Sequence, residues 1–251
     1  HDNQTLWDKL AETLPEADEE ERMRLNRMAA ALYMTCQGTL FFLSGEEFAR
    51  TKGGLEDSYN APIALNRLDW EQAWKNRGLV EYYRGLIALR RQLPGLCDKS
   101  GRAAERIYGI RKERGAVSFL VDNCTRENEG PHRENEAQYR GCMQDGAAVT
   151  SRWHTLKIVY NSSRTERPVS LDGEGWMVLC DGKNSRLWES DHPAAGEIKA
   201  APQSVLILGQ PAGAKGSSAE DRMSVNCGTK AAEEHIEKAG KQENTWRKKA
   251  V

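Results

Sequence analysis

Residues 38–70 read GTLFFLSGEEFARTKGGLEDSYNAPIALNRLDW, and this stretch decides the fold class. The run at 39–43 is continuously apolar, too short for a helix, and lacks the alternation of a half-exposed strand. A parallel strand that is buried on both faces has this pattern. Glu46, Glu47 and a long polar loop follow the run. This order is typical of the C-terminal mouth of an α/β barrel, where such barrels keep their chemistry. The alternative is an ordinary strand followed by a surface loop.

A helix is expected on each side of this run. Acidic residues crowd the first turns of the upstream helix near Asp18, where the helix dipole favours negative charge. Gly38 suits a left-handed stop after it. The downstream helix begins at Asp69 with Gln72 as a capping box, and Pro94 ends it. In the upstream helix, spacings of three and four predict one apolar stripe made of Leu25, Met28, Ala29, Leu32, Tyr33 and Cys36.

The pattern changes after Gly101. Short runs rich in β-branched or aromatic residues follow, separated by Gly, Asn and Asp and without an intervening helix. Such a series predicts an antiparallel β-sandwich. Within it, Leu156, Ile158 and Tyr160 alternate with more polar residues, which predicts a face that is half exposed. The predicted strands lie at 106–110, 116–121, 155–161, 168–171, 176–180 and 203–208.

The fold class expected from these patterns is α/β followed by all-β. Residues 1–98 would be the C-terminal part of a (β/α)8 barrel, with its last helix, strand and helix. Residues 99–210 would be the sandwich, with a polar insertion at 123–152 that contains Arg-Glu-Asn-Glu twice. Residues 211–251 are rich in Gly, Ala, Ser, Lys and Glu, and a disordered polar tail is expected there.

Composition narrows the function classes. The net charge of −1 among 251 residues argues against a nucleic-acid or anionic-membrane partner, because both need a basic excess. The apolar runs fall well short of the roughly 20 residues of a membrane span. The six cysteines and five histidines lack the spacing of metal ligands, so neither a metal nor another cofactor is expected. Reduced thiols in a cytoplasmic protein are expected rather than disulfides, with Cys36 and Cys180 buried.

Two quoted segments resemble a known family. The opening residues 1–10, HDNQTLWDKL, are similar to the fourth conserved sequence block of type I pullulanases, starch-debranching members of the α-amylase superfamily. The short segments GEEF, RTK, SYN and NRLDW within residues 45–70 resemble the last barrel strand of that family and the loop after it. The two matches follow the family's order. The resemblance is specific over residues 1–95, loose over 101–210 and absent from the tail.

The resemblance implies α-1,6-glucosidic hydrolysis by a retaining mechanism, with an aspartate nucleophile, a glutamate acid/base and a third aspartate. Asp2 matches that third aspartate, which stabilises the transition state, and His1 matches the histidine beside it that binds the sugar. We find no counterpart of the nucleophile or of the acid in this chain. The isolated chain is therefore expected to be inactive, and the rest of the barrel would be required.

The polar loop offers further substrate-binding candidates for an α-glucan such as pullulan, branched starch or glycogen. Tyr59 suits stacking on the apolar face of a glucose ring, while Arg50, Asp57 and Asn60 offer partners for its hydroxyl groups. The alternative is that these four residues tie down a long loop. Glu46 and Glu47 are expected to be structural, because neighbouring residues on a strand point to opposite faces.

This sequence also departs from the family pattern. Gly38-Thr39-Leu40-Phe41 stands where the family has Gly-Ile-Pro-Phe, Leu43-Ser44 replaces a polar residue and an alanine, and Asp57 replaces an asparagine. These departures affect the inference about the preferred glycosidic linkage more than the resemblance to the family. A partial barrel would also leave bare strand edges, so residues 1–95 are expected to be less stable than the sandwich.

Two other functions remain open. The sandwich alone would be a non-catalytic carbohydrate-binding or scaffolding module, with Trp153, Trp176 and Trp188 as sugar platforms or as buried core residues. Another debranching activity of the same superfamily, isoamylase-like or directed at glycogen, is the third hypothesis.

Overall fold

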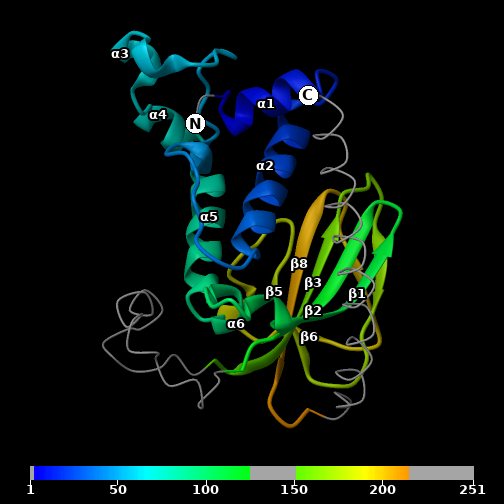
Figure 1. The fold of residues 1–251 in the computed structure, drawn as a ribbon. Helices are drawn as coiled ribbons and strands as arrows, with labels where there is room; N and C mark the ends of the chain where they lie inside the picture. Colours follow the sequence, from blue (N-terminus) through cyan, green and yellow to red (C-terminus); the bar gives the residue numbers. More distant parts are fainter. Residues whose placement is uncertain (1–2, 125–150, 215–251) are drawn as a thin grey trace, which may run out of the picture. The chain divides into compact units, whose positions relative to one another are not determined.

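The computed structural model describes residues 3–124 and 151–214, all of which belong to one compact unit. The site residues His1 and Asp2, most of the 123–152 insertion and the tail beyond residue 214 lie outside the described residues. Helices occupy the first hundred residues and antiparallel strands follow (Figure 1). The helices are α1 Leu6–Thr13, α2 Glu19–Met34, α3 Ile63–Asn66, α4 Trp70–Lys75, α5 Arg77–Arg90 and α6 Pro94–Cys97.

Local signals set the beginning of α2, but distant contacts decide which face is buried. The helix begins where it was predicted, near Asp18, which caps it and accepts a hydrogen bond from the Glu21 amide at 2.7 Å. The predicted apolar stripe is correct only in part: Met28 and Tyr33 pack against the core. Cys36 is exposed and Leu32 is 38% exposed. The buried residues of α2 are Asn26, Ala30, Ala31 and Met34, because this face meets α5 and the sheet.

Residues 39–43 do not form the predicted buried strand. They run as an extended segment, and Phe41 in its middle is 84% exposed. Phe42 packs instead between Tyr33 and Tyr83, with ring centroids 5.9 Å from each. A parallel strand needs neighbours for its backbone groups, and the described residues provide none here. The prediction therefore fails in this chain for lack of pairing partners.

The single helix expected after Asp69 is divided into two. Asp69 caps α4 by accepting from the amides of Glu71 and Gln72. The Gln72 side chain does not complete the capping box, because it donates to the Ala49 carbonyl at 2.7 Å. Asn76 interrupts the helical backbone between α4 and α5. Its side chain donates to the Phe48 carbonyl at 2.9 Å, so both amides fasten the helices to the preceding turn.

The strands confirm the antiparallel prediction. A six-stranded sheet has the order β1-β2-β3-β8-β5-β6, and β4 pairs with β7 in a second, two-stranded sheet. All the predicted strands are present within a few residues of their expected ends. The short β6 and β7 were missed. The strands are β1 Ile107–Glu113, β2 Ala116–Asp122, β3 Trp153–Asn161, β4 Arg167–Ser170, β5 Trp176–Cys180, β6 Pro193–Ala194, β7 Glu197–Ala200 and β8 Ser204–Pro211.

Both faces of the central strand β3 are covered, so the expected half-exposed face is wrong. Leu156 and Ile158 point into a core shared with α2 and α5. Val159 belongs to a second apolar cluster that includes Val169 of β4. On the same side, Lys157 Nζ donates to the Ser170 carbonyl at 2.6 Å and remains buried. The six-stranded sheet is thus packed between helices on one face and the small sheet on the other.

The helices and the sheet share one continuous core. The larger apolar cluster joins Leu86 and Leu89 of α5 to Leu156 of β3 and Ile207 of β8. Gly85 of α5 lets the segment after β5 approach the helix closely, since a Cβ atom there would lie 2.0 Å from Ser185 Oγ. The predicted boundary at residue 98 therefore crosses a common core, and two separate domains remain a prediction.

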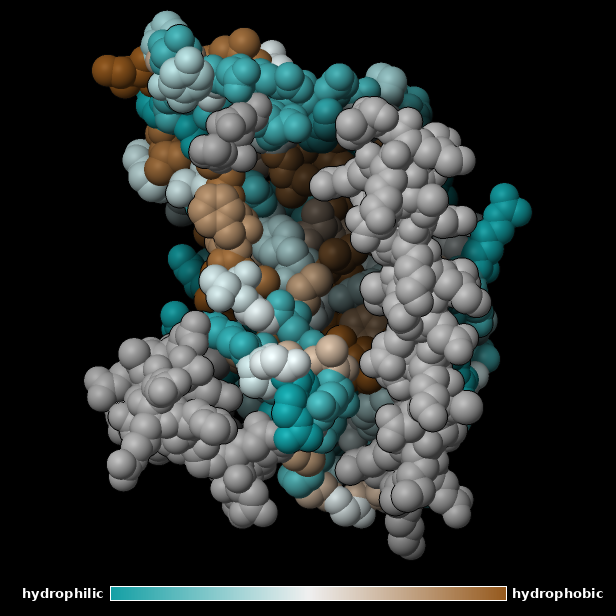
Figure 2. Space-filling model, in the orientation of Figure 1, coloured by the Kyte–Doolittle hydropathy of each residue, from teal (hydrophilic) through white to brown (hydrophobic). Residues whose placement is uncertain are grey.

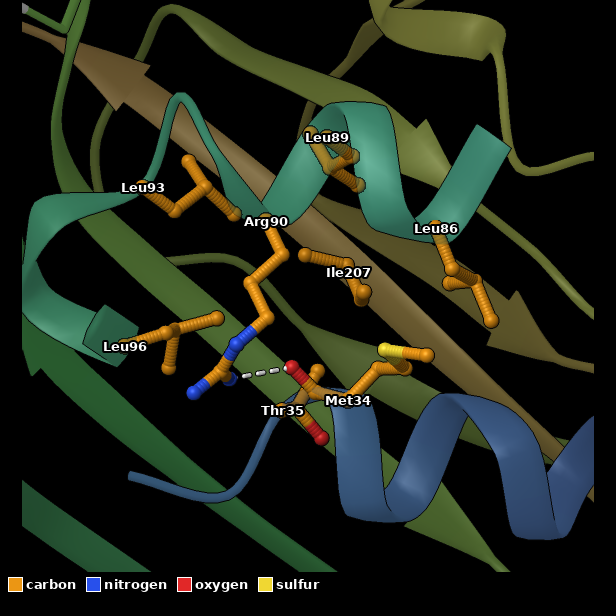
Figure 3. A pocket seen from close by; sticks show the side chains of 8 residues that line it. All are labelled: Met34, Thr35, Leu86, Leu89, Arg90, Leu93, Leu96 and Ile207. Carbon is orange, nitrogen blue, oxygen red and sulfur yellow. Dashed lines mark hydrogen bonds between the residues drawn. The ribbon is translucent and has the colours of Figure 1, made fainter. Parts of the chain in front are cut away.

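Arg90 closes the end of α2 against α5. Its guanidinium donates to the carbonyls of Met34 at 2.6 Å, Cys36 at 2.7 Å and Gly38 at 3.0 Å. Figure 3 shows the guanidinium beside the last turn of α2, with the surrounding apolar side chains drawn from α5, α6 and β8. The terminal carbonyls of a helix lack partners within the helix, and a cation also suits its negative end.

We predict that Arg90→Met lowers the free energy of unfolding by about 2 kcal/mol, because a neutral side chain of similar length makes none of these charged hydrogen bonds. Urea unfolding followed by circular dichroism measures the change. Arg84→Met is the matched control on the same helix: Arg84 is exposed and pairs with Glu81, so a loss below about 1 kcal/mol is expected. Equal losses in the two variants would contradict the capping role.

Candidate functional site

The predicted substrate loop begins at a turn in which two carboxylates accept hydrogen bonds from backbone amides. Glu46 and Glu47 lie on the 3-10 helix η1 Glu46–Phe48 rather than on a strand. Glu46 accepts from the Leu43 amide at 3.0 Å, and Glu47 accepts from the Gly45 amide at 2.8 Å. Partial burial raises the pKa of Glu46. These bonds support the expected structural role, although the expected strand geometry is wrong.

Arg50 holds the two ends of the loop together. Its side chain is only 8% exposed and donates to the carbonyls of Ser44, at 3.0 Å, and Asn66. Gly45 makes room for it, since a Cβ atom there would lie 2.6 Å from Arg50 Cδ. Arg50 thus ties the loop, as the alternative expected, and its contact with sugar hydroxyls stays a prediction.

The other three loop candidates are displayed to solvent. Asp57, Tyr59 and Asn60 are exposed, and Tyr59 on the 3-10 helix η2 Ser58–Asn60 is 84% exposed. Ser58, which lies between Asp57 and Tyr59 in the sequence, is held by two hydrogen bonds. Lys52 Nζ donates to Ser58 Oγ, and the Asn66 side-chain amide donates to the Ser58 carbonyl at 2.6 Å. The bonds to Ser58 therefore fix the backbone next to the exposed Tyr59. Asp57 and Asn60 supply a carboxylate and an amide close to it in the sequence.

Asp8 joins the N-terminal segment to this loop, a role that the sequence patterns did not reveal. Its carboxylate is buried and accepts from the Thr51 hydroxyl and from the Lys52 amide, the latter at 2.7 Å. Gln4 adds a second link by donating to the Gly54 carbonyl at 3.1 Å. Thr5 caps α1 by accepting from the Asp8 amide at 3.2 Å, which places Asp8 in the first turn. The chain just after Asp2 is therefore fastened to the loop.

The sequence analysis also missed a buried polar residue behind the turn. Asn26 accepts from the Tyr83 hydroxyl at 2.8 Å, and its amide lies 3.4 Å from the Glu46 carbonyl. Tyr33 donates to the Glu46 carboxylate at 3.4 Å. These bonds connect α2, α5 and η1, and so set the position of the turn from which the loop starts. Asn26 was not part of the stripe predicted for α2, so no sequence pattern pointed to it.

Two of the three candidate tryptophans take the buried alternative of the prediction. Trp153 and Trp176 are each 3% exposed and form part of the apolar core, so the sugar-platform hypothesis is wrong for both. Trp188 is half-buried. Trp70 and Trp74 of α4, which the sequence analysis did not select, are 70% and 73% exposed. Exposed aromatic surface is therefore gathered at the α4 end of the protein rather than on the sheet.

The described residues contain no group of three or more His, Cys, Asp or Glu arranged to hold a metal ion. Cys180 is buried as predicted, whereas Cys36 is exposed, and both are free thiols. Across 3–124 and 151–214, none of the helices has the length and apolar character needed to cross a membrane.

Sequence comparison finds debranching enzymes. The chain is 39% identical over 106 residues to the pullulanase of Bacillus subtilis, covering 42% of this chain and 15% of that protein. It is 39% identical over 226 residues to the pullulanase of Klebsiella aerogenes, covering 72% of this chain and 20% of that protein. A glycogen debranching enzyme of Salmonella typhi is 38% identical over 82 residues, or 33% of this chain and 12% of that protein. No family model matches.

Solved structures agree in fold. A pullulanase from Bacillus acidopullulyticus superposes with a TM-score of 0.68 at 26% identity, covering 84% of this chain and 23% of that one. A Paenibacillus barengoltzii pullulanase, in complex with maltohexaose and α-cyclodextrin, gives 0.63 at 29% identity over 84% of this chain and 29% of that one. The chain is a pullulanase relative. Its partial coverage fits a fragment of a type I pullulanase.

The chain spans a fifth or less of the pullulanases and the glycogen debranching enzyme it matches in sequence. The described fold, helices on an antiparallel sheet, resembles a part of the pullulanase structure. The activity and ligands of whole pullulanases are therefore matters for proposal in this chain.

We predict that Asp8→Ala loosens the 51–60 loop, because the Thr51 hydroxyl and the Lys52 amide both lose their acceptor. The expected loss is about 1–3 kcal/mol in the free energy of unfolding, with amide exchange at Lys52 faster by about tenfold. Glu12→Gln is the control on the same helix, where Glu12 meets only the exposed Lys9 among the described residues. Unchanged exchange at Lys52 in Asp8→Ala would show that the loop is held by other contacts.

Proposed function

We propose that this chain is the C-terminal portion of a pullulanase-like debranching enzyme that hydrolyses α-1,6-glucosidic linkages in glucans with retention of configuration. The observation that carries the proposal is the double link from the N-terminal segment to the 51–60 loop, through Gln4–Gly54 and Asp8–Lys52. Asp2 precedes Gln4 by two residues in the sequence, and two residues of chain span at most about 7 Å. Connectivity thus supports a common site for Asp2 and the loop.

Each residue would have a distinct part in that site. Asp2 would stabilise the oxocarbenium-like transition state through the sugar hydroxyls, and His1 would bind the same ring. Tyr59 would stack on a neighbouring glucose, with Asp57 and Asn60 as hydroxyl partners. Arg50, whose two terminal guanidinium nitrogens donate to backbone carbonyls, would position the loop. The nucleophile and the acid/base would come from earlier barrel strands.

The remainder of the barrel is the partner that this chain requires. Phe41 is 84% exposed in an extended segment, and Ile63 of α3 is 86% exposed. Figure 2 shows apolar surface at the α3 end and between α5 and α2. Exposed apolar patches of this kind mark protein interfaces. Earlier strands of the barrel would cover residues 39–43 and convert them into the parallel strand that the sequence pattern favours.

A glycogen-directed debranching activity is the second candidate, and the Salmonella typhi relative favours it. Both candidates place the same residues at the same type of linkage, and they differ in branch length. The hypothesis of a non-catalytic carbohydrate-binding module built on the sheet is weakened, because two of its three proposed sugar platforms, Trp153 and Trp176, are buried.

We predict that the chain alone releases no reducing sugar from pullulan, because it carries one of the three carboxylates that a retaining debranching enzyme needs. Co-expression with the earlier barrel segment of the Bacillus subtilis relative is expected to restore release. In that complex Asp2→Asn should abolish it, whereas Asp191→Asn, an exposed carboxylate on the sheet side, should leave it unchanged. Reproducible release by the chain alone, or full activity of Asp2→Asn, would overturn the proposal.

A further inference from the structure

A wide groove lies between the helices at the end of the molecule away from the sheet. Trp7 of α1, Arg22 of α2 and the α4 residues Glu71 and Trp74 form its walls, and its volume is about 810 Å³. Ligand pockets commonly have about 300–1,000 Å³. The residues of the loop site, Asp57, Tyr59 and Asn60, do not line it. The groove is therefore a separate surface of ligand size.

The charges in the groove nearly cancel. Glu19, Asp69 and Glu71 contribute three carboxylates, and Arg22 and Lys75 contribute two cations. Glu19 and Lys75 already approach each other to 3.9 Å. Strong binding of a phosphate or of a metal ion needs an excess of one sign. The mixed charge instead suits a neutral ligand with many hydroxyl groups, which bind to donors and acceptors alike.

The groove also has an exposed aromatic platform. Trp74 is 73% exposed, and the Arg77 guanidinium lies 5.3 Å from its ring centroid. The Arg22 guanidinium lies 5.5 Å from the ring centroid of Trp7, which is half-buried and packs against the core. A guanidinium over one face of an indole restrains the ring and leaves its other face for a ligand. The apolar face of a pyranose ring packs well on such a surface.

Two amide side chains that line the groove are held in place by hydrogen bonds before any ligand binds. Gln72 and Asn76 each donate through their nitrogen to a backbone carbonyl, those of Ala49 and Phe48. Each amide therefore has a set position, and its oxygen remains an acceptor for a ligand hydroxyl. Groups that are ordered before binding lose little entropy when the ligand arrives. Aromatic surface and preset polar groups occur together here, as in a sugar-binding site.

We propose that this groove binds a linear α-glucan chain and so forms an additional glucan-binding site beside the loop site. The chemistry of the groove selects a neutral oligosaccharide, and the choice of an α-glucan rests on the proposed function. Thr51 connects the two sites, since it lines the groove and its hydroxyl bonds to Asp8. A bound glucan would therefore contact the segment that carries the loop.

Isothermal titration of the full chain with maltohexaose tests the proposal. Wild type is expected to bind, and Trp74→Ala is expected to weaken binding about tenfold through loss of the stacking platform. Trp70→Ala is the matched control: the residue type, helix and exposure are the same, and Trp70 does not line the groove. Circular dichroism of both variants verifies that the fold is kept. Cellohexaose, a β-linked glucan of the same length, is expected not to bind.

A loss of affinity more than threefold greater in Trp74→Ala than in Trp70→Ala supports the site. A smaller difference, no binding by wild type, or equal binding of cellohexaose overturns it. Loss of maltohexaose binding upon co-expression with the earlier barrel segment also overturns it, because the groove would then be a protein interface. Pullulan hydrolysis by that complex is a separate readout. If hydrolysis is restored while the titration fails, the proposed function stands and only the groove proposal is lost.

Discussion

The structure depends on the packing of α2 and α5 against one face of the six-stranded sheet. Leu86 and Leu89 of α5 meet Leu156 of β3 and Ile207 of β8 in a core with less than 3% exposure at each position. Burying a side chain of this size stabilises a fold by about 1.5–3 kcal/mol, and many such residues contribute here. This interface gives the helical region a stable base on the sheet.

The same packing fixes the candidate site through a short series of contacts. Tyr83 of α5 and Asn26 of α2 meet at 2.8 Å, and Asn26 lies against the turn at Glu46. That turn leads directly to Arg50, which binds the far end of the loop at Asn66. The loop is therefore positioned by helices that are positioned by the sheet. A substitution in the core would therefore change the position of Tyr59 even though the substituted residue does not contact it.

Sequence patterns predicted elements whose cause is local. Asp18 caps α2 by bonding a backbone amide three residues away, and predicted strands such as β3 and β8 carry their own β-branched residues. Failures occurred where the cause is distant in sequence. Residues 39–43 have the composition of a buried strand, but a strand forms only beside another strand. The buried face of α2 was misplaced because Tyr83 and Glu46 provide partners for Asn26, and no periodicity in α2 reveals them.

A common core implies that the helices and the strands unfold together, contrary to the expectation that residues 1–95 would be the less stable part. Native-state hydrogen exchange in increasing urea tests this most directly. The account predicts that the slowest amides of α5 and those of β3 and β8 exchange with the same free energy of opening and the same urea dependence. Loss of protection in α5 at urea concentrations where β3 and β8 remain protected would contradict it.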